Sequence, residues 1–390
     1  MKPEAPIPPP LRIVHVLRAP VGGLFRHVLD LTREQAARGH AVGVIADSLT
    51  GGARGDALLA ELEPKLALGL MRLPIQRGPS LEDIPALAKI SRRLAALKPD
   101  VIHGHGSKGG LFARLAGLPW PSAPAMRAYT PHGGSLNYLP GTRRHQAYMW
   151  IEALLARRTN LLLFESAFIA SRFAAEVGRP RGVAKIVHNG VAASELSPVA
   201  AAADAADFLY VGEFRSVKGL DTLLDALSLL AKDGRRPRLA MVGDGPDKAA
   251  LLARASALSV AEQLTMKAPM GVRDAFAQGR IMVVPSRLES LPYIVLEAAA
   301  ARKPLVATRV GGVPEIFGPY ADRLIACDDP QALADAMRGE LDADPVKADA
   351  EAAQLAEHVA ANFSLQNMVD AIIAGYRQAL AQREPARSCR

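Results

Sequence analysis

Short apolar runs with β-strand character alternate with helical stretches of ten or more residues along almost the whole chain. In the first half these runs occupy residues 11–17, 41–46, 101–103, 125–129, 161–164 and 184–187. In the second half they occupy residues 207–211, 238–242, 263–266, 281–284, 304–307 and 323–326. Strands that alternate with helices are typical of βαβ units, in which the strands run parallel. The sequence therefore predicts an α/β fold built from doubly wound parallel sheets.

The length of the chain and one break in this pattern predict two domains. A chain of 390 residues is longer than a single core usually supports. The Ala- and Asp-rich stretch 197–206 lacks strand character and separates the two series of strands. We predict a first domain over residues 11–196, a second over residues 207–365, and a C-terminal helix over residues 366–383 that packs back on the first domain.

The composition is that of a globular protein in a reducing compartment. Hydrophobic residues make up 49% and charged residues 22% of the chain, which argues against disordered and fibrous classes. The two cysteines, Cys327 and Cys389, lie far apart and predict neither a disulfide framework nor a cysteine metal site. No apolar stretch approaches the roughly 18 residues of a membrane span, and residues 1–10 lack the apolar core of a signal peptide. We therefore expect a cytoplasmic protein.

Positive charge is concentrated in the first half of the chain. Residues 1–195 hold 25 Lys and Arg against 14 Asp and Glu, a net charge of +11, whereas residues 196–390 have a net charge of −3. This asymmetry predicts an anionic partner for the first domain, either a membrane surface, a phosphate-bearing acceptor or nucleic acid. A helix expected over residues 143–158 has arginines at both ends, and between them lie Tyr148, Met149, Trp150, Leu154 and Leu155. This arrangement favours the inner face of a membrane over nucleic acid. The alternative is that the apolar residues of this helix face the domain core.

Glycines follow several of the expected strands, and open parallel sheets bind ligands at the carboxyl ends of their strands. Gly22 and Gly23 follow the first strand, and Gly243 lies in a Val-Gly-Asp-Gly-Pro segment after the second strand of the second half. Such glycines let backbone approach a ligand, but tight turns explain them equally well. The complete G-x-G-x-x-G fingerprint is missing at these junctions, so the sequence does not favour NAD as a cofactor.

The segment 281–297 carries two glutamates around an expected helix start. An apolar strand leads into a loop with Glu289, Ser290 and Leu291, and Pro292 then opens a helix that contains Glu297. Free N–H groups at a helix N-terminus favour a phosphate or a sugar oxygen. Carboxylates accept hydrogen bonds from sugar and ribose hydroxyls. The alternative is that both glutamates are ordinary surface acids.

Two cations lie in the loop after the first strand of the second half. The segment 211–219 reads V-G-E-F-R-S-V-K-G and places Arg215 and Lys218 before a helix. The arginine fork and the lysine point charge both suit a diphosphate. A solvated loop is the alternative.

The second half resembles the retaining glycosyltransferases of family 4, which have the GT-B fold. Glu289 and Glu297 match the E-x7-E signature of that family, followed by Lys303-Pro304 and by G-G-V-P-E at 311–315. The resemblance implies that Glu289 contacts the transferred sugar and Glu297 the nucleotide ribose. In the family the loop 211–219 often reads G-R-L-x-x-x-K-G, which matches Lys218 directly.

The chain departs from the family pattern at one cation. Glu213 stands where the arginine of that loop often occurs. We expect Arg215, two positions later, to replace it at the diphosphate.

The first half carries matching segments in the family's order. T-P-H-G-G at 130–134 resembles the T-x-H-G segment, which implies that His132 lies near the reacting centre. His105, in D-V-I-H-G-H-G, is also family-like, and we expect it to pack its loop. Gly22 and Gly23 are expected to admit the donor phosphate or sugar. A structural role is the alternative for each of these residues.

The resemblance extends over residues 11–363 and implies a retaining glycosyltransferase. We expect it to move a sugar from a nucleotide-diphosphate donor to a glycan or lipid-linked acceptor in cell-surface polysaccharide biosynthesis, without a cofactor or metal. The Asp342-Ala343-Asp344 segment is expected to be solvated rather than to bind a metal. The expected catalytic residues are His132, Glu289, Arg215 and Lys218, and the expected donor-binding residues are Gly22, Gly23, Gly243, Ser290, Leu291 and Glu297.

Three other functions remain open from the sequence. Paired carboxylates also serve glycoside hydrolases, which would use Glu289 and Glu297 as acid and base. A nucleotide-sugar epimerase shares the two-domain architecture. A non-catalytic sensor would bind the donor without turnover.

Overall fold

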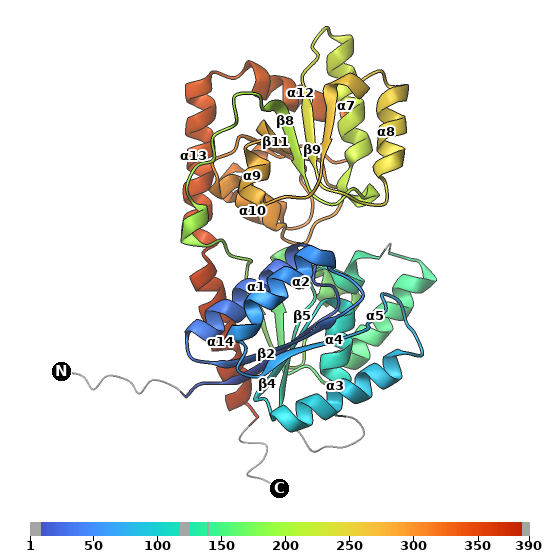
Figure 1. Ribbon diagram of the computed structural model, residues 1–390, viewed down its shortest axis with the longest axis vertical. Helices are drawn as coiled ribbons and strands as arrows, with labels where there is room; N and C mark the ends of the chain where they lie inside the picture. Colours follow the sequence, from blue (N-terminus) through green and yellow to red (C-terminus); the bar gives the residue numbers. More distant parts are fainter. Residues whose placement is uncertain (1–8, 118–124, 139, 384–390) are drawn as a thin grey trace, which may run out of the picture. The chain divides into compact units, whose positions relative to one another are not determined.

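The computed structural model describes residues 9–117, 125–138 and 140–383, and the chain divides into two compact units (Figure 1). Unit 1 consists of residues 1–187 together with 368–390, and unit 2 consists of residues 188–367. Each unit holds one parallel sheet with helices packed against it. The predicted class, an α/β fold with two doubly wound parallel sheets, is confirmed.

The sheet of unit 1 has seven parallel strands in the order β3-β2-β1-β4-β5-β6-β7. The central strand β1 pairs with β2 on one side and with β4 on the other, so that His15 lies beside Val44 and His103. The strands are β1(Arg12–Leu17), β2(Ala41–Asp47), β3(Gly69–Leu73), β4(Val101–His105), β5(Met126–Thr130), β6(Leu161–Phe164) and β7(Val183–Ile186).

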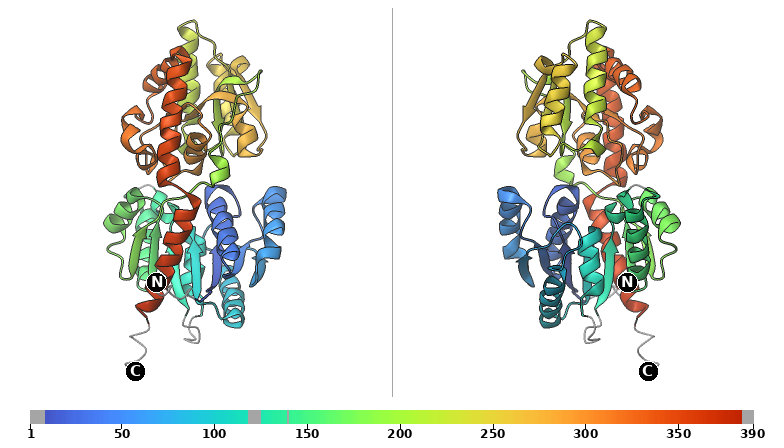
Figure 2. Two further views of the ribbon diagram at one scale, coloured as in Figure 1. Left: turned by 90° about the vertical axis from the view of Figure 1, so that its left-hand side faces the viewer. Right: turned by 90° about the vertical axis from the view of Figure 1, so that its right-hand side faces the viewer.

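Helices cover both faces of this sheet (Figure 2). One face packs Val42 and Val44 against Phe25 and Leu29, and the other packs residues such as Val14 against Ile90. Because both faces are covered, the inner strands are near-continuous apolar runs. The helices are α1(Gly22–Ala37), α2(Gly52–Leu62), α3(Asp83–Leu97), α4(Gly106–Leu115), α5(Arg143–Ala156), α6(Ala167–Glu176) and the greater part of α14(Leu365–Ala381), with short 3-10 turns at η1(Glu63–Lys65) and η2(Gly134–Asn137).

The sheet of unit 2 has five parallel strands in the order β10-β9-β8-β11-β12. They are β8(Ala206–Val211), β9(Leu239–Val242), β10(Leu264–Lys267), β11(Gly279–Val284) and β12(Leu305–Ala307). The helices are α7(Leu220–Lys232), α8(Lys248–Ala257), α9(Val272–Phe276), α10(Tyr293–Ala300), α11(Val313–Phe317), α12(Pro330–Asp342) and α13(Pro345–Asn362), with 3-10 turns at η3(Ala193–Glu195), η4(Ser216–Lys218), η5(Ala261–Gln263) and η6(Gly318–Arg323).

Three details differ from the prediction. β3 was not predicted, because its sequence Gly-Leu-Met-Arg-Leu forms a half-buried edge strand without clear alternation. Residues 323–326 do not form a strand; Ile325 makes only an isolated bridge with Thr308. The boundary between the units lies at 187/188, so residues 188–196 and the stretch 197–206 both belong to unit 2.

The C-terminal helix α14 crosses that boundary, and from Met368 onward it belongs to unit 1. Tyr376 on this helix is fully buried, and its hydroxyl lies 2.7 Å from Nδ1 of His103 on β4. Asp370 pairs with Arg38 at the end of α1. The helix therefore closes one face of the unit-1 sheet directly over its central strands.

A buried ion pair lies beneath the loop that follows β5. Arg114 on α4 donates to Glu152 on α5 at 2.8 Å, and both side chains are almost completely buried. Glu152 also accepts hydrogen bonds from the hydroxyls of Tyr129 and Ser135. Ser135 lies in η2, only three residues after His132. The pair therefore ties the His132 loop to two helices of unit 1.

We predict that Glu152→Ala lowers the free energy of unfolding of unit 1 by about 3–5 kcal/mol, because it leaves the Arg114 charge buried without its partner. Urea unfolding followed by tryptophan fluorescence reports on this unit, since Trp150 lies on α5 and residues 188–367 contain no tryptophan. The control is Asp56→Ala, which removes an exposed pair with Arg72 and should cost at most about 1 kcal/mol. Equal losses in the two variants would contradict this account.

Candidate functional site

Each sheet has one point at which the strand order reverses, and open parallel sheets bind ligands beyond the carboxyl ends of their strands at such a point. In unit 1 this point lies between β1 and β4, and in unit 2 between β8 and β11. Gly22 follows β1, and Lys218 and Glu289 follow β8 and β11. The sequence-predicted residues therefore gather at the two switch points, with His132 after the neighbouring strand β5.

In unit 2 the structure brings Glu289 and Lys218 together. The ammonium of Lys218 donates to Oε1 of Glu289 at 2.6 Å, and the hydroxyl of Ser286 donates to the same oxygen at 2.7 Å. The Glu289 side chain is 9% exposed and that of Lys218 is 25% exposed. The pair fixes a carboxylate and a cation side by side at the edge of the sheet. Sequence reasoning had treated the two residues separately and had given Ser286 no role.

Three loops interlock around this pair. Gly311, after β12, has φ +56°, and a Cβ atom there would overlap the backbone oxygen of Glu289. Gly219, after β8, has φ +65°, and its Cβ would overlap the backbone oxygen of Pro285. Both positions therefore require glycine on conformational and steric grounds. The glycines let the loops after β8, β11 and β12 lie directly against one another and hold Glu289 in place.

Arg287 is a member of this site that sequence reasoning missed. Its guanidinium donates to Asp221 at 2.8 Å and also pairs with Asp328, and its backbone N–H donates to the oxygen of Val217 at 2.9 Å. The bond to Asp221 is the main cause that raises the pKa of Arg287 above its usual value. Arg287 thus ties the loop of Glu289 to the loop of Lys218. Its position two residues before Glu289 was the available signal.

The helix start after Glu289 is confirmed with a one-residue shift. Pro292 is the N-cap and α10 begins at Tyr293, so the first backbone N–H groups of α10 have no partner within the helix. Leu291 is 2% exposed, and its carbonyl accepts from the Asn189 side chain at 2.8 Å. Ser290 and Glu297 are partly exposed. This segment can therefore offer a ligand its backbone groups, but not the buried side chain of Leu291.

Two other expected donor-site residues of unit 2 have structural explanations. Arg215 lies 3.5 Å from the carboxylate of Glu213, so the acid that departs from the family pattern partly neutralises it. A Cβ at Gly243 would overlap the oxygen of Gly212, which explains that glycine by loop packing alone. Lys218 also pairs with a carboxylate, and it is the stronger candidate for a phosphate contact because it matches the family segment directly.

The expected helix start in unit 1 is open. Gly22 and Gly23 are exposed and form the first residues of α1. Gly22 has φ +67°, and a Cβ atom there would have no neighbour within 4 Å. The glycine thus serves backbone conformation at an uncrowded helix N-terminus, which leaves space for an anionic group.

His132 lies in a strained part of the loop after β5. Its φ of +50° is left-handed, and Gly133 and Gly134 continue in the same region. For a residue with a Cβ this conformation costs about 1–3 kcal/mol and is common at functional sites. Nε2 of His132 lies 3.1 Å from Nδ1 of His105. Burial, with a smaller contribution from His27, lowers the pKa of His132 well below its usual value, so its ring is neutral at pH 7.

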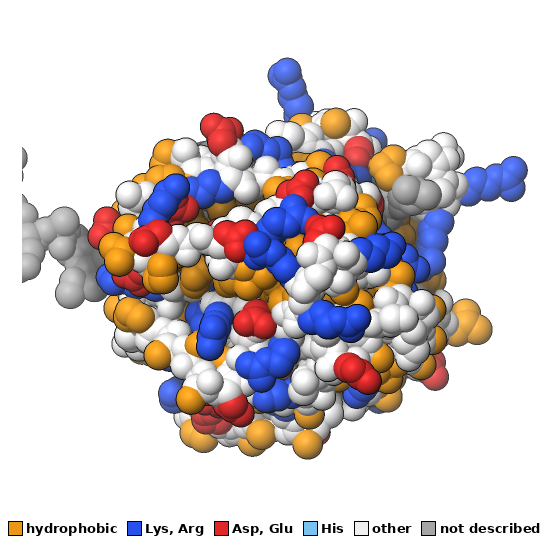
Figure 3. Space-filling model, turned by 90° about the horizontal axis from the view of Figure 1, so that it is seen from above, with side chains coloured by type: hydrophobic (Ala, Val, Ile, Leu, Met, Phe, Trp, Pro, Cys, Tyr) orange, Lys and Arg blue, Asp and Glu red, His pale blue; other side chains and the backbone are white. Residues whose placement is uncertain are grey.

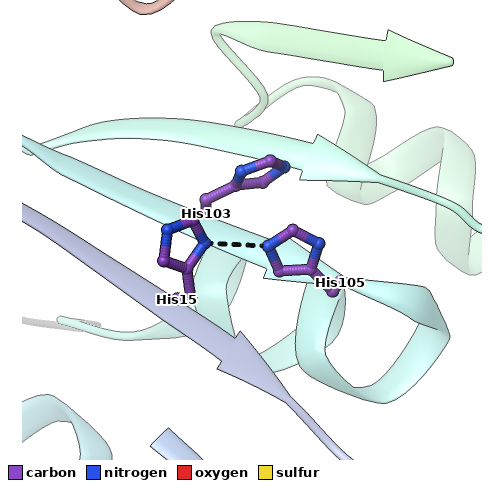
Figure 4. Close-up of side chains that lie close together, drawn as sticks. All are labelled: His15, His103 and His105. Carbon is purple, nitrogen blue, oxygen red and sulfur yellow. Dashed lines mark hydrogen bonds between the residues drawn. The ribbon is translucent and has the colours of Figure 1, made fainter. Parts of the chain in front are cut away.

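His132 belongs to a histidine cluster that the sequence did not reveal as a unit. It comprises His15 on β1, His27 on α1, His103 and His105 on β4, and His132. His15, His103 and His105 project from neighbouring strands toward one another (Figure 4). The alternating H-x-H spacing puts His103 and His105 on one face of β4, and His15 lies beside His103 in the sheet. The sequence does not show the register of β1 against β4, and so it did not predict that these histidines lie together.

The Asp-Ala-Asp segment has structural roles. Asp344 accepts hydrogen bonds from the N–H groups of Val346 and Lys347 and caps α13. Asp342 pairs with Arg235. Both carboxylates are therefore engaged in the fold of unit 2.

Comparisons with known proteins agree with this arrangement. The profile of the family described as Glycosyltransferase Family 4 matches residues 21–195. That of the glycosyl transferases group 1 matches residues 195–359. Together they match most of the chain and meet close to the boundary between the units.

Individual proteins are similar over different lengths. The chain is 26% identical to the glycogen synthase of Mycobacterium tuberculosis, over 94% of this chain and 93% of that protein. It is 35% identical to the putative teichuronic acid biosynthesis glycosyltransferase TuaC of Bacillus subtilis, but this match spans only 33% of the chain and 31% of TuaC. The solved structure of HepE from Anabaena in complex with UDP has a TM-score of 0.72 at 19% identity, and the match covers 93% of this chain and 99% of HepE. This last likeness shows a shared fold.

Proposed function

Because this chain belongs to the family-4 glycosyltransferases with the GT-B fold, we propose that it transfers a sugar from a nucleotide-diphosphate donor to a glycan or lipid-linked acceptor with retention of anomeric configuration. The observation that carries the proposal is the Lys218–Glu289 pair at the β8/β11 switch point. A cation suits the diphosphate and an adjacent carboxylate suits the sugar hydroxyls. The UDP bound to HepE supports a uridine nucleotide as the first donor to test.

Lys218 supplies what bond cleavage needs. When the bond between the sugar and the diphosphate breaks, negative charge develops on the departing phosphate, and a positive group fixed beforehand stabilises it. The ammonium of Lys218 is held by Glu289 through one of its three N–H donors. In this proposal the remaining donors of Lys218 and the positive end of the α10 helix face the phosphate oxygens. Glu289 in turn orients the sugar.

The remaining residues take supporting roles in this proposal. Glu297, on the second turn of α10, binds the ribose hydroxyls of the donor. Gly22 and Gly23 at the start of α1 admit the phosphate or sugar, and His132 contacts the transferred sugar. The glycoside hydrolase alternative fits less well, because a hydrolase acts on glycosides without phosphate and needs no cation beside its carboxylates, whereas the ammonium of Lys218 lies 2.6 Å from Oε1 of Glu289.

We also propose that unit 1 docks on the anionic inner face of the cell membrane, where a lipid-linked acceptor would lie. On α5, Trp150 is 65% exposed, and Ile151 and Leu154 are also exposed, whereas Leu155 faces the core. Arg143, Arg144, Arg157 and Arg158 at the two ends of this stripe are exposed as well. The alternative that the apolar residues pack into the core holds for Met149 and Leu155, which are buried, but not for Trp150, Ile151 or Leu154.

The basic ends of α5 lie in the half of the chain that carries the excess positive charge, since residues 1–195 have a net charge of +11. Figure 3 shows a face of the molecule on which basic and acidic side chains are interspersed. In the part of the chain that the structure describes, no helix is both long and apolar enough to cross a bilayer.

The donor site predicts different effects for two substitutions. Lys218→Ala should lower kcat by about 10²–10³ with a smaller effect on donor binding, because it removes stabilisation of the leaving group. Glu297→Ala should mainly raise the donor KM, because a ribose contact is made equally in the ground and transition states. Steady-state kinetics with circular dichroism as the folding control separates the two. Unchanged kinetics in a folded Lys218→Ala protein would remove Lys218 from the mechanism.

We further propose that transfer needs no divalent metal. Lys218 and the α10 N-terminus supply the positive charge at the phosphates, and the Asp-Ala-Asp carboxylates are engaged elsewhere. Transfer should therefore continue at an undiminished rate in excess EDTA. Complete loss on chelation that Mg²⁺ or Mn²⁺ restores would show that a metal neutralises the diphosphate.

Membrane docking predicts sedimentation with anionic vesicles at low salt, weakening as salt rises, since each basic residue near such a surface contributes about 1 kcal/mol. The double variant Arg143→Glu/Arg144→Glu should bind less. Lys89→Glu/Arg92→Glu, on exposed positions of α3, makes the same change in net charge and should bind like the native protein. The native protein staying in the supernatant with anionic vesicles at low salt would contradict docking.

A further inference from the structure

Three buried side chains of unit 1 and the partly exposed His132 are joined end to end by hydrogen bonds. Oε1 of Gln35, on α1, lies 2.8 Å from Nε2 of His15. Nδ1 of His15 lies 3.0 Å from Nε2 of His105, the bond drawn in Figure 4. Nδ1 of His105 lies 3.1 Å from Nε2 of His132. We call this series of hydrogen bonds the Gln35–His132 chain. It runs from helix α1 to the strained loop after β5.

The three imidazoles of the chain are neutral. Gln35, His15 and His105 are at most 1% exposed. Burial lowers the pKa of His15 to about 4, and it lowers the pKa values of His105 and His132 well below the usual value. A neutral imidazole carries one N–H and one lone pair, so the role of one nitrogen determines the role of the other.

The direction of the chain follows from its buried end. The carbonyl oxygen of Gln35 accepts only, so Nε2 of His15 carries the proton and Nδ1 of His15 accepts from Nε2–H of His105. Nδ1 of His105 then accepts from Nε2–H of His132. We propose that the Gln35–His132 chain fixes His132 as its Nε2–H tautomer and so leaves Nδ1 of His132 as a hydrogen-bond acceptor toward a sugar hydroxyl. His15, His105 and Gln35 are positioning residues in this scheme.

His103 lies next to the chain without belonging to it. Its ring centroid is 4.0 Å from that of His105, but its nitrogens bond to the hydroxyls of Tyr376 and Thr130. The nitrogens of His15, His103 and His105 lie within 4.8 Å of one another, as metal ligands would. Both nitrogens of each of these three rings already have hydrogen-bond partners, which favours a hydrogen-bonded chain over a metal centre.

The consequence for catalysis rests on the proposed function. A sugar hydroxyl that donates to Nδ1 of His132 is held in one orientation, whereas a mixture of tautomers would present a donor part of the time. The φ of +50° at His132 sets the direction of its side chain. The buried Arg114–Glu152 pair holds the loop that carries His132 in place. The fold therefore positions the His132 ring, and the Gln35–His132 chain fixes which of its two nitrogens carries the proton.

The test is ¹⁵N NMR of the full chain labelled at its histidines, without ligand at pH 7.5, because ring nitrogen shifts distinguish the two tautomers. The His132→Gln variant identifies the His132 signals among the nine histidines. We expect protonated Nε2 and unprotonated Nδ1 at His132. His15→Phe should cut the chain and give a mixture of tautomers at His132. His103→Phe, the same change at an equally buried neighbouring position, should leave His132 unchanged. Gln35→Met serves as a second cut if His15→Phe does not fold.

Three results would overturn the proposal. They are a His132 ring found as the Nδ1–H tautomer or as imidazolium, an identical His132 spectrum in all folded variants, and stoichiometric Zn²⁺ uptake by the native protein that is lost in His105→Gln. Because the spectra need no donor, a fixed tautomer in a protein that transfers no sugar would contradict the proposed function and leave the chain standing. In an active enzyme, His15→Phe should lower kcat/KM about tenfold, the loss expected for one hydrogen bond, and His103→Phe should not.

Discussion

The ion pair between Lys218 and Glu289 joins two loops whose residues are 71 positions apart in sequence. Its geometry depends on the parallel pairing of the neighbouring strands β8 and β11, whose carboxyl ends lie at the same end of the sheet. Gly219 and Gly311 remove the side chains that would separate the loops, and Arg287 ties the loops to each other. Under the proposed function, a carboxylate and an ammonium held in this way are in place before the donor binds, which is what electrostatic catalysis requires.

In unit 1 the groups at the switch point are neutral rather than charged. Its switch point holds imidazoles that burial keeps uncharged and an open glycine helix start. A neutral histidine orients hydroxyls without adding charge near a sugar that becomes electron-poor as its bond breaks. The buried Arg114–Glu152 pair holds the His132 loop through Ser135. In the proposed mechanism the charged groups that act on the donor belong to unit 2, and unit 1 contributes neutral imidazoles.

The sequence predicted the parallel sheets, because apolar strand runs and glycines at strand ends are local signals. It predicted that Lys218 and Glu289 follow strands and that a helix begins within one residue of Tyr293. Those segments have both local chemistry and a family resemblance. The sequence could not predict contacts that depend on strand register or on packing between segments far apart in the chain. The adjacency of His15 and His103, the hydrogen bond from Tyr376 and the bracing by Arg287 all join segments that no local pattern links. The edge strand β3 was missed because its burial is incomplete.

The central claim is that unit 2 binds a nucleotide-diphosphate sugar through Lys218 and Glu289 and that the enzyme transfers that sugar. The most direct measurement is a binding and turnover screen of the purified full chain against UDP-, GDP- and ADP-sugars, with release of nucleoside diphosphate as the readout. The account predicts that one nucleotide class binds and releases its diphosphate, and that Lys218→Ala abolishes most of the release. Absence of binding to every donor in the panel, together with cleavage of glycosides that lack phosphate, would contradict it.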